Sequence, residues 1–236
     1  HRLCQESSLP IVSIGRLSNI HSIATYANEA LSELVEHLVT DHMRSKIALI
    51  EGPSENPDSL ERGKTVRETL DRLNVPLLES HIVQGDFLEA SGASAIRILF
   101  DRRGLNSSDI DAIIALNDQM AAGVLYELAA RGISVPNEIS VIGFDDDDFA
   151  RSANPPLTTV SQPIELMGER AIQAVTALID KKATNEYVLL DAEPVWRRSC
   201  GCEVPQASRY VSVIPQDITS NAIEASKEHC YERYNN

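Results

Sequence analysis

The regular alternation of short apolar runs with amphipathic helical segments is the feature that most constrains this chain. The runs typical of strands lie at 11–15, 46–50, 80–83, 110–116, 139–144 and 187–190. The segments with helical spacing lie at 27–40, 60–73, 90–101, 117–131 and 165–181. Strands separated by helices of this length form right-handed βαβ units and parallel sheets. We therefore expect an α/β fold whose ligands bind at the carboxyl ends of the strands.

Length and composition indicate one large globular domain or two lobes. The chain has 236 residues, and 43% of them are hydrophobic, which is enough for a substantial core. No apolar run reaches the roughly 18 residues that a membrane span needs, and the first residues lack a secretory stretch. The cysteines, Cys4, Cys200, Cys202 and Cys230, are not spaced as a disulfide framework. We expect a cytoplasmic protein without a membrane partner.

The net charge of -14 argues against nucleic-acid binding by this chain alone, because so negative a surface repels phosphate groups. Any DNA contact is therefore expected only through a segment absent from this chain. The sequence also lacks the GxGxxG, GxxxxGK[ST], GxSxG and HExxH motifs of cofactor-binding, phosphate-binding and hydrolytic sites. We expect no enzymatic activity.

Polar side chains follow three successive predicted strands at the point where each strand ends. Asp86 follows the third strand, Asn117 and Asp118 follow the fourth, and Asp145 follows the fifth. Because parallel strands end at the same edge of a sheet, we expect these groups to converge there. Carboxylates and an amide suit the hydroxyl groups of a sugar or nucleoside. Each residue alone could instead be a helix cap or turn residue.

Two larger side chains extend this predicted ligand-binding site. Arg62, near the start of the helix after Gly52-Pro53, could form paired hydrogen bonds with a ligand oxygen or carboxylate. Phe87 could stack on the apolar face of a sugar. Without a role in ligand binding, Arg62 would be a solvated arginine in the first turn of the helix, and Phe87 would be a core residue.

The sequence offers two possible metal sites and favours neither. The acidic run 145–148 could bind Mg²⁺, as in a Mg²⁺-dependent hydrolase, but only some of four consecutive residues can face one point. The sequence gives little support for a zinc site at Cys200-Gly201-Cys202, because no spaced Cys or His pair accompanies these cysteines. His37 and His42 are one residue too far apart for an i, i+4 pair, which favours ordinary histidines. We expect no metal and no cofactor.

Several sequence motifs follow one another in a characteristic order. They read NDQMAAG at 117–123, RGISVP at 131–136, ISVIGFDD at 139–146 and PPLTTVSQP at 155–163. Before them come His37-Leu38, Ile47-Ala48 with Gly52-Pro53, and Gly85-Asp86-Phe87. In this order and spacing the chain resembles the LacI/GalR family of regulators over about residues 9–202.

The resemblance implies two Rossmann-like lobes with parallel sheets, of the type I periplasmic-binding-protein-like kind, with an effector bound between them. The N-terminal lobe is incomplete in this chain. We assign 1–50 to the remainder of the N-terminal lobe, 51–163 to the C-terminal lobe, 164–202 to a crossover helix and closing strand, and 203–236 to a tail or linker.

The resemblance also implies function. By motif match, the family's ligand contacts fall on Arg62, Phe87, Asn117 and Asp145, and members form homodimers. The chain is then the small-molecule sensor of a transcriptional regulator or signal-transduction protein.

Its ending, VWRRSCGC at 195–202, is similar to sensor modules fused to diguanylate cyclase or kinase domains. Tyr26-Ala27 stands where the family often has Asp-Asn, which leaves a degenerate interaction module without ligand as an alternative.

Overall fold

A four-stranded parallel sheet forms the centre of the larger lobe. The computed structural model describes residues 9–17, 20–182 and 187–203. The strands lie in the order β4-β3-β5-β6 and span Ile82–Gln84, Ile47–Glu51, Ala112–Ala115 and Ser140–Ile142. All neighbouring pairs are parallel. The polar groups that follow β4, β5 and β6 therefore emerge at one edge.

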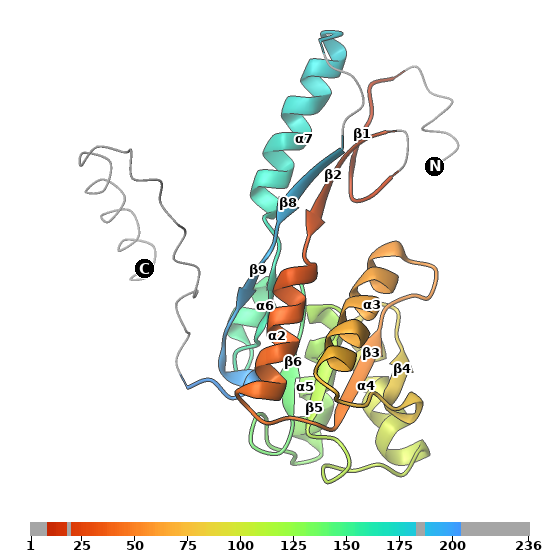
Figure 1. Ribbon diagram of the computed structural model, residues 1–236, viewed down its shortest axis with the longest axis vertical. Helices are drawn as coiled ribbons and strands as arrows, with labels where there is room; N and C mark the ends of the chain where they lie inside the picture. Colours follow the sequence, from red (N-terminus) through yellow and green to blue (C-terminus); the bar gives the residue numbers. More distant parts are fainter. Residues whose placement is uncertain (1–8, 18–19, 183–186, 204–236) are drawn as a thin grey trace, which may run out of the picture. The chain divides into compact units, whose positions relative to one another are not determined.

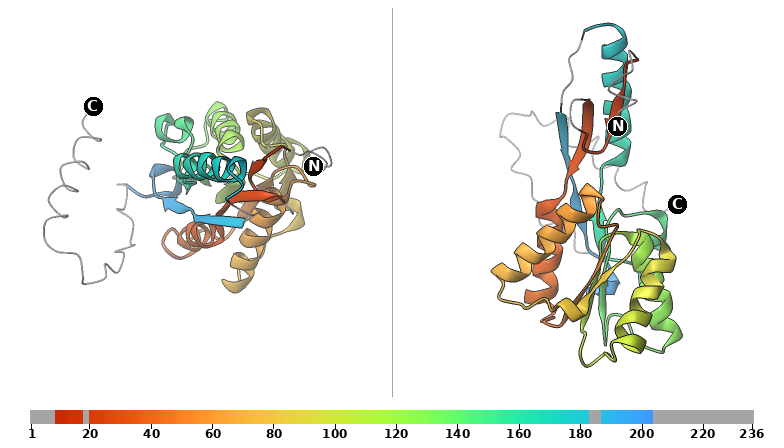
Figure 2. Two further views of the ribbon diagram at one scale, coloured as in Figure 1. Left: turned by 90° about the horizontal axis from the view of Figure 1, so that it is seen from above. Right: turned by 90° about the vertical axis from the view of Figure 1, so that its right-hand side faces the viewer.

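Helices cover both faces of this sheet. α2 (Asn28–Thr40) and α3 (Pro57–Arg72) lie on one side, and α4 (Glu89–Arg97) and α5 (Asp118–Ala130) lie on the other, as the right-hand view of Figure 2 shows. A strand covered on both faces must be apolar throughout, which explains the continuous apolar runs of the sequence. The first four residues of β3 are fully buried.

A second parallel sheet contains three strands in the order β1-β2-β8, which span Val12–Ile14, His21–Tyr26 and Tyr187–Asp191. α7 (Ile164–Ile179) packs beside β1 and β2, as Figure 1 shows. None of the described helices is long and apolar enough to cross a membrane.

Three stretches of chain connect the two sheets. β2 leads into α2, β7 (Thr159–Ser161) leads into α7, and β8 leads into β9 (Glu193–Val195). β7 and β9 pair in antiparallel fashion between the sheets. Three short helical segments complete the larger lobe: η1 (Glu79–His81), η2 (Ile98–Arg102) and α6 (Asp148–Ser152). A last turn, η3 (Arg198–Cys200), follows β9.

The expected α/β class with parallel sheets is confirmed, and each predicted strand and helix has a counterpart. The lobe boundary at residue 50 is wrong. β3 pairs with β4 and β5, and α2 packs against α3, so both elements belong to the larger lobe rather than to an N-terminal one. The predicted tail lies outside the described residues from 204 onward.

Candidate functional site

A cavity of about 200 Å³ lies where the carboxyl edge of the four-stranded sheet faces the three-stranded sheet. One wall comes from β1, β2 and the start of α2, and the opposite wall comes from the first turns of α3 and the segment after β6. Its polar lining includes Arg16, Thr25, Asn28, Asp58, Arg62 and Gln162. The cavity therefore combines groups from both lobes.

Arg62 is the central side chain of this cavity, with only 14% of its side chain exposed. Its Nη1 donates a hydrogen bond of 2.7 Å to the carbonyl oxygen of Leu116, directly after β5. Its Nη2 lies 3.8 Å from Oδ1 of Asp145, after β6. The guanidinium carbon lies 3.6 Å from the ring centre of Phe144 and 5.9 Å from that of Phe87. A guanidinium has five N–H donors, so Arg62 keeps donors for a ligand.

The start of α3 places Arg62 there. Asn56 caps the helix, because its side-chain oxygen accepts hydrogen bonds from the backbone N–H groups of Asp58 (2.9 Å) and Ser59 (3.1 Å). Asp58, Glu61 and Arg62 then lie on one face of the first two turns, as spacings of three and four residues require. Glu61 forms an ion pair with Arg16 across the cavity.

Asp145 lies behind Arg62 and Gln162, both of which line the cavity. Its Oδ1 accepts a hydrogen bond of 2.7 Å from Nε2 of Gln162. Burial raises the pKa of Asp145 to about 6, although the charge of Arg62 opposes this effect. The chain turns sharply here, with φ +124° at Asp145. Asp145 thus holds two cavity side chains in position.

Asn117 and Asp118 are buried and engaged in contacts with the protein itself. Asn117 accepts a hydrogen bond from the backbone N–H of Met120 (3.0 Å), which caps α5, and donates one to the carbonyl oxygen of Phe87 (2.9 Å). Asp118 accepts hydrogen bonds from the hydroxyl of Thr159 (2.7 Å) and from the N–H of Asp147 (3.0 Å). These contacts match the alternative of capping residues that the sequence left open.

Asp86 lies at the surface, where its carboxylate accepts a hydrogen bond of 2.9 Å from the N–H of Leu88 and closes a local turn. Phe87 follows with φ +69°, and its ring packs against Gly52, where a Cβ atom would lie 2.2 Å from the ring. We expected Asp86, Asn117 and Asp145 to converge. Instead, Arg62 gathers groups from the three strand ends, and Asp86 has turned outward.

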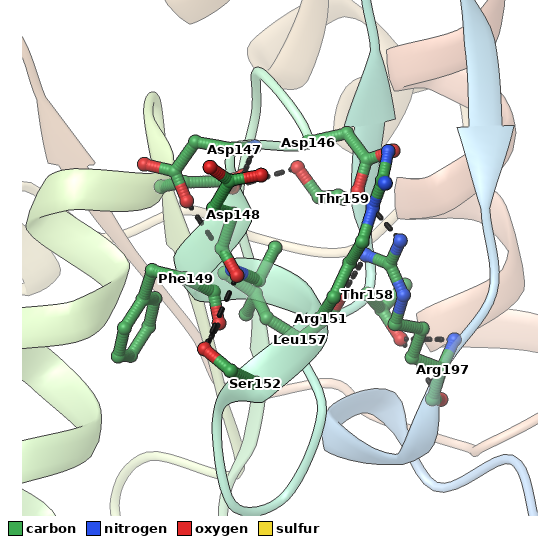
Figure 3. A network of polar contacts seen from close by, with 12 residues as sticks. Asp146, Asp147, Asp148, Phe149, Arg151, Ser152, Leu157, Thr158, Thr159 and Arg197 are labelled. Atoms are coloured by element: carbon green, nitrogen blue, oxygen red, sulfur yellow. Dashed lines mark hydrogen bonds and ion pairs between the residues drawn. The ribbon is translucent and has the colours of Figure 1, made fainter. Parts of the chain in front are cut away.

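The acidic run does not converge on one point. Asp146 binds Arg197 at 2.6 Å, and Asp147 caps α6 by accepting from the N–H of Ala150, while Asp148 is exposed. Figure 3 shows Asp146 and Asp147 directed to different partners. Among the described residues, these separate contacts argue against a Mg²⁺ site in the acidic run and so against a Mg²⁺-dependent hydrolase.

Sequence reasoning missed six polar residues of the cavity: Arg16, Thr25, Asn28, Asp58, Glu61 and Gln162. Asp58 precedes Arg62 by four residues on α3, so helical spacing could have identified it. Asn28 directly follows Tyr26-Ala27, the pair at which this chain differs from the family pattern, and its side-chain amide lines the cavity. Thr25 lies on β2, a strand that the sequence did not predict, and Gln162 joins the site only through the crossover after β7.

Comparisons with known proteins agree with this geometry. Residues 35–200 match the family model of the periplasmic binding protein-like domain. The HTH-type transcriptional regulator CelR of Thermobifida fusca is 36% identical over 162 residues, which cover 69% of this chain and 45% of that protein. The chain thus spans about half the length of the curated relatives it matches.

Solved structures give the same picture. A complex of the transcriptional regulator CelR with cellobiose has a TM-score of 0.72 and 30% identity, covering 80% of this chain and 58% of that one. A dimeric Lac repressor with a C-terminal deletion has a TM-score of 0.69 and 26% identity, covering 80% and 67%. The chain belongs to the periplasmic-binding-protein-like domain family, and its relatives are regulators of the LacI family.

Proposed function

We propose that this chain is the effector-binding sensor domain of a LacI/GalR-like transcriptional regulator or signal-transduction protein, without enzymatic activity of its own. Its effector is a small, hydroxyl-rich molecule of the sugar or nucleoside class, bound in the cavity beside Arg62. The observation that carries this proposal is a buried arginine with spare donors in a polar cavity between two lobes.

The chemistry of the cavity favours a neutral polyhydroxyl ligand. Arg62 and the amide groups of Asn28 and Gln162 can donate hydrogen bonds, and Asp58 can accept them from hydroxyl groups. The face of Phe144 is already covered by Arg62, so apolar contact with the ligand falls to Met167 and its aliphatic neighbours. A volume of about 200 Å³ favours one sugar ring or a nucleoside. A relative bound to cellobiose supports the sugar class.

Signalling follows from the two-lobed construction. Three stretches of chain connect the sheets, and the cavity takes side chains from both sides. A ligand that binds one arrangement of the lobes better than another shifts the population toward it. The output, on DNA or through a fused signalling domain, then depends on segments other than the described residues.

We also propose a homodimer. α7 and β8 expose large apolar side chains, among them Ile172 at 68% and Ile179 at 62%. Several large exposed apolar side chains on these two elements favour a protein contact surface there. A dimeric Lac repressor among the structural relatives supports the same assembly.

A thermal-shift screen of sugars, nucleosides and polyols tests the effector proposal. A true ligand at 100 times its Kd should raise the free energy of unfolding by roughly 2.7 kcal/mol. Arg62→Met should abolish this stabilisation. Arg67→Met is the matched control, because Arg67 lies on the same helix but pairs with Glu51 at 2.8 Å, outside the cavity lining.

The screen also separates the alternatives. Stabilisation of wild type and Arg67→Met, but not of Arg62→Met, supports the proposal. If no compound stabilises the wild type, the chain is a degenerate interaction module. Equal stabilisation of all three proteins places the ligand elsewhere and contradicts the site.

A further inference from the structure

Two histidines from the C-terminal end of α2 meet two cysteines that follow β9. The candidate ligand atoms of His37, His42, Cys200 and Cys202 all lie within 4.8 Å of one another. Nε2 of His37 lies 2.9 Å from Nε2 of His42 and 3.2 Å from Sγ of Cys202, and that sulfur lies 3.6 Å from Nε2 of His42. None of the four lines the cavity beside Arg62.

The three distances among His37, His42 and Cys202 are close to one face of a small tetrahedron, with Cys200 near its fourth corner. Zinc binds histidine nitrogen at about 2.0–2.1 Å and thiolate sulfur at about 2.3 Å, which places neighbouring ligand atoms about 3.3–3.8 Å apart. The separations of 2.9 to 3.6 Å among His37, His42 and Cys202 need only small adjustments to meet this geometry, and the sulfur of Cys200 lies within 4.8 Å of all three. We propose that His37, His42, Cys200 and Cys202 bind one Zn²⁺ ion in a closed tetrahedral site.

The surroundings of His37 support this assignment. Its Nδ1 lies 2.8 Å from a carboxylate oxygen of Asp41. A carboxylate on one ring nitrogen holds the proton there and leaves the other nitrogen free to bind a metal, as in carboxylate–histidine–zinc arrangements. The ring of Trp196 packs against His37 with 4.3 Å between ring centres, which fixes the orientation of the imidazole.

Gly201 lets the two cysteines approach His42. Its φ of +122° lies in the region that favours glycine, and a Cβ atom there would lie 2.7 Å from Nδ1 of His42. Any larger residue would push the segment between the two cysteines away from the imidazole. The Cys-Gly-Cys sequence is therefore shaped to the histidine that it contacts.

The ligand set selects zinc among the common metals. Two thiolates with two imidazoles in tetrahedral geometry are typical of Zn²⁺. Four protein ligands leave no open position, so the site is structural rather than catalytic. The ion would join the end of α2 to the segment that leads out of the lobe after β9, a link across more than 150 residues of sequence.

A zinc ion at these four residues would depart from the expectation of no metal. The sequence offers no second Cys or His pair near Cys200, and His37 and His42 do not share a helical face. The fold brings the two pairs together, since His42 lies beyond the end of α2 and turns back toward His37.

Metal analysis of the complete chain tests the proposal. Protein stripped with a chelator and reloaded should retain one zinc per chain. Reloading with Co²⁺ should give a thiolate-to-cobalt charge-transfer band and the intense visible bands of tetrahedral cobalt. Cys202→Ser should weaken cobalt binding at least about 100-fold, and Asp41→Asn about 10–100-fold. Cys230→Ser is the matched control and should bind as the wild type does.

Specific outcomes would overturn it. Wild-type protein that takes up no zinc, or that gives the weak spectrum of octahedral cobalt, has no such site. Cobalt binding unchanged in both Cys202→Ser and Asp41→Asn places the metal elsewhere. If Cys202→Ser does not fold, the wild-type spectrum and Asp41→Asn decide the question. Sugar binding through Arg62 is independent of all these results.

Discussion

At the scale of single residues, Asp118 shows how a strand-end carboxyl group can serve the fold instead of the ligand. It is fully buried and ties α5 to Thr159 and to the backbone at Asp147. Burial raises its pKa to about 7, although the hydrogen bond from Thr159 opposes this effect. The folded protein therefore holds this proton more firmly than the unfolded chain does.

We predict a specific pH dependence of stability from this residue. Between the unfolded pKa of 3.8 and the folded value of about 7, the folded state binds more protons than the unfolded state. The free energy of unfolding should then fall as pH rises through this window, relative to Asp118→Asn. At about 1.4 kcal/mol per pKa unit, the difference should reach roughly 2–4 kcal/mol by neutral pH.

Urea denaturation of both proteins from pH 4 to pH 8 measures this difference. Asp148→Asn provides the control, because Asp148 directly follows Asp147, whose N–H binds Asp118, but its own side chain is exposed. A wild-type curve that runs parallel to that of Asp118→Asn would contradict the prediction.

The residues of the candidate site could be predicted only in part. Arg62 and Asp145 lie at the cavity or directly behind it, because strand ends and helix starts meet at that edge. Side-chain direction could not be predicted. Asp86 sits at the correct strand end, yet its carboxylate binds the N–H of Leu88 and faces solvent.

At the scale of elements, α4 and α5 pack closely because two glycines face the opposite backbone. A Cβ atom on Gly92 would lie 1.9 Å from the carbonyl oxygen of Met120, and one on Gly123 would lie 2.0 Å from that of Glu89. Neither glycine has the positive φ that would itself require glycine. Packing distance alone therefore explains both residues.

Replacing glycine by alanine should have opposite effects on stability at Gly123 and at Gly168. Gly123→Ala must push α4 and α5 apart, so the free energy of unfolding should fall by about 1–3 kcal/mol or more. Gly168→Ala, on α7 with open space around it, should raise the free energy of unfolding by about 0.4–1 kcal/mol. Thermal or urea unfolding measures both. Equal effects at the two positions would refute this account of the helix pair.

The elements that the sequence predicted are those with a strong physical pattern. β3 and β5 are covered on both faces and are therefore continuously apolar. β2, β7 and β9 were missed because they carry polar residues or a proline and pair outside the main sheet. Their place depends on tertiary contacts, which local composition does not encode.

At the scale of the whole molecule, the apolar surface of α7 and β8 predicts self-association. Ile172→Glu should convert a dimer into a monomer in light-scattering chromatography, because it places a charge in the proposed contact. Leu60→Glu, which changes a side chain that is 59% exposed on α3, should leave the dimer intact. A wild-type monomer at all concentrations would contradict the proposed homodimer.

The two-lobed arrangement also explains why the complete site lay beyond sequence reasoning. One wall follows from the strand ends of the larger sheet. The other wall requires β1, β2 and the start of α2 to face that edge, which only the crossovers between sheets determine.

The most direct test of the account is a crystal structure of this chain with a sugar or nucleoside found in the screen. We predict that a ligand oxygen will lie about 2.7–3.2 Å from a guanidinium nitrogen of Arg62, between α3 and the start of α2. A ligand bound on any other surface, with Arg62 still covered by protein groups alone, would contradict it.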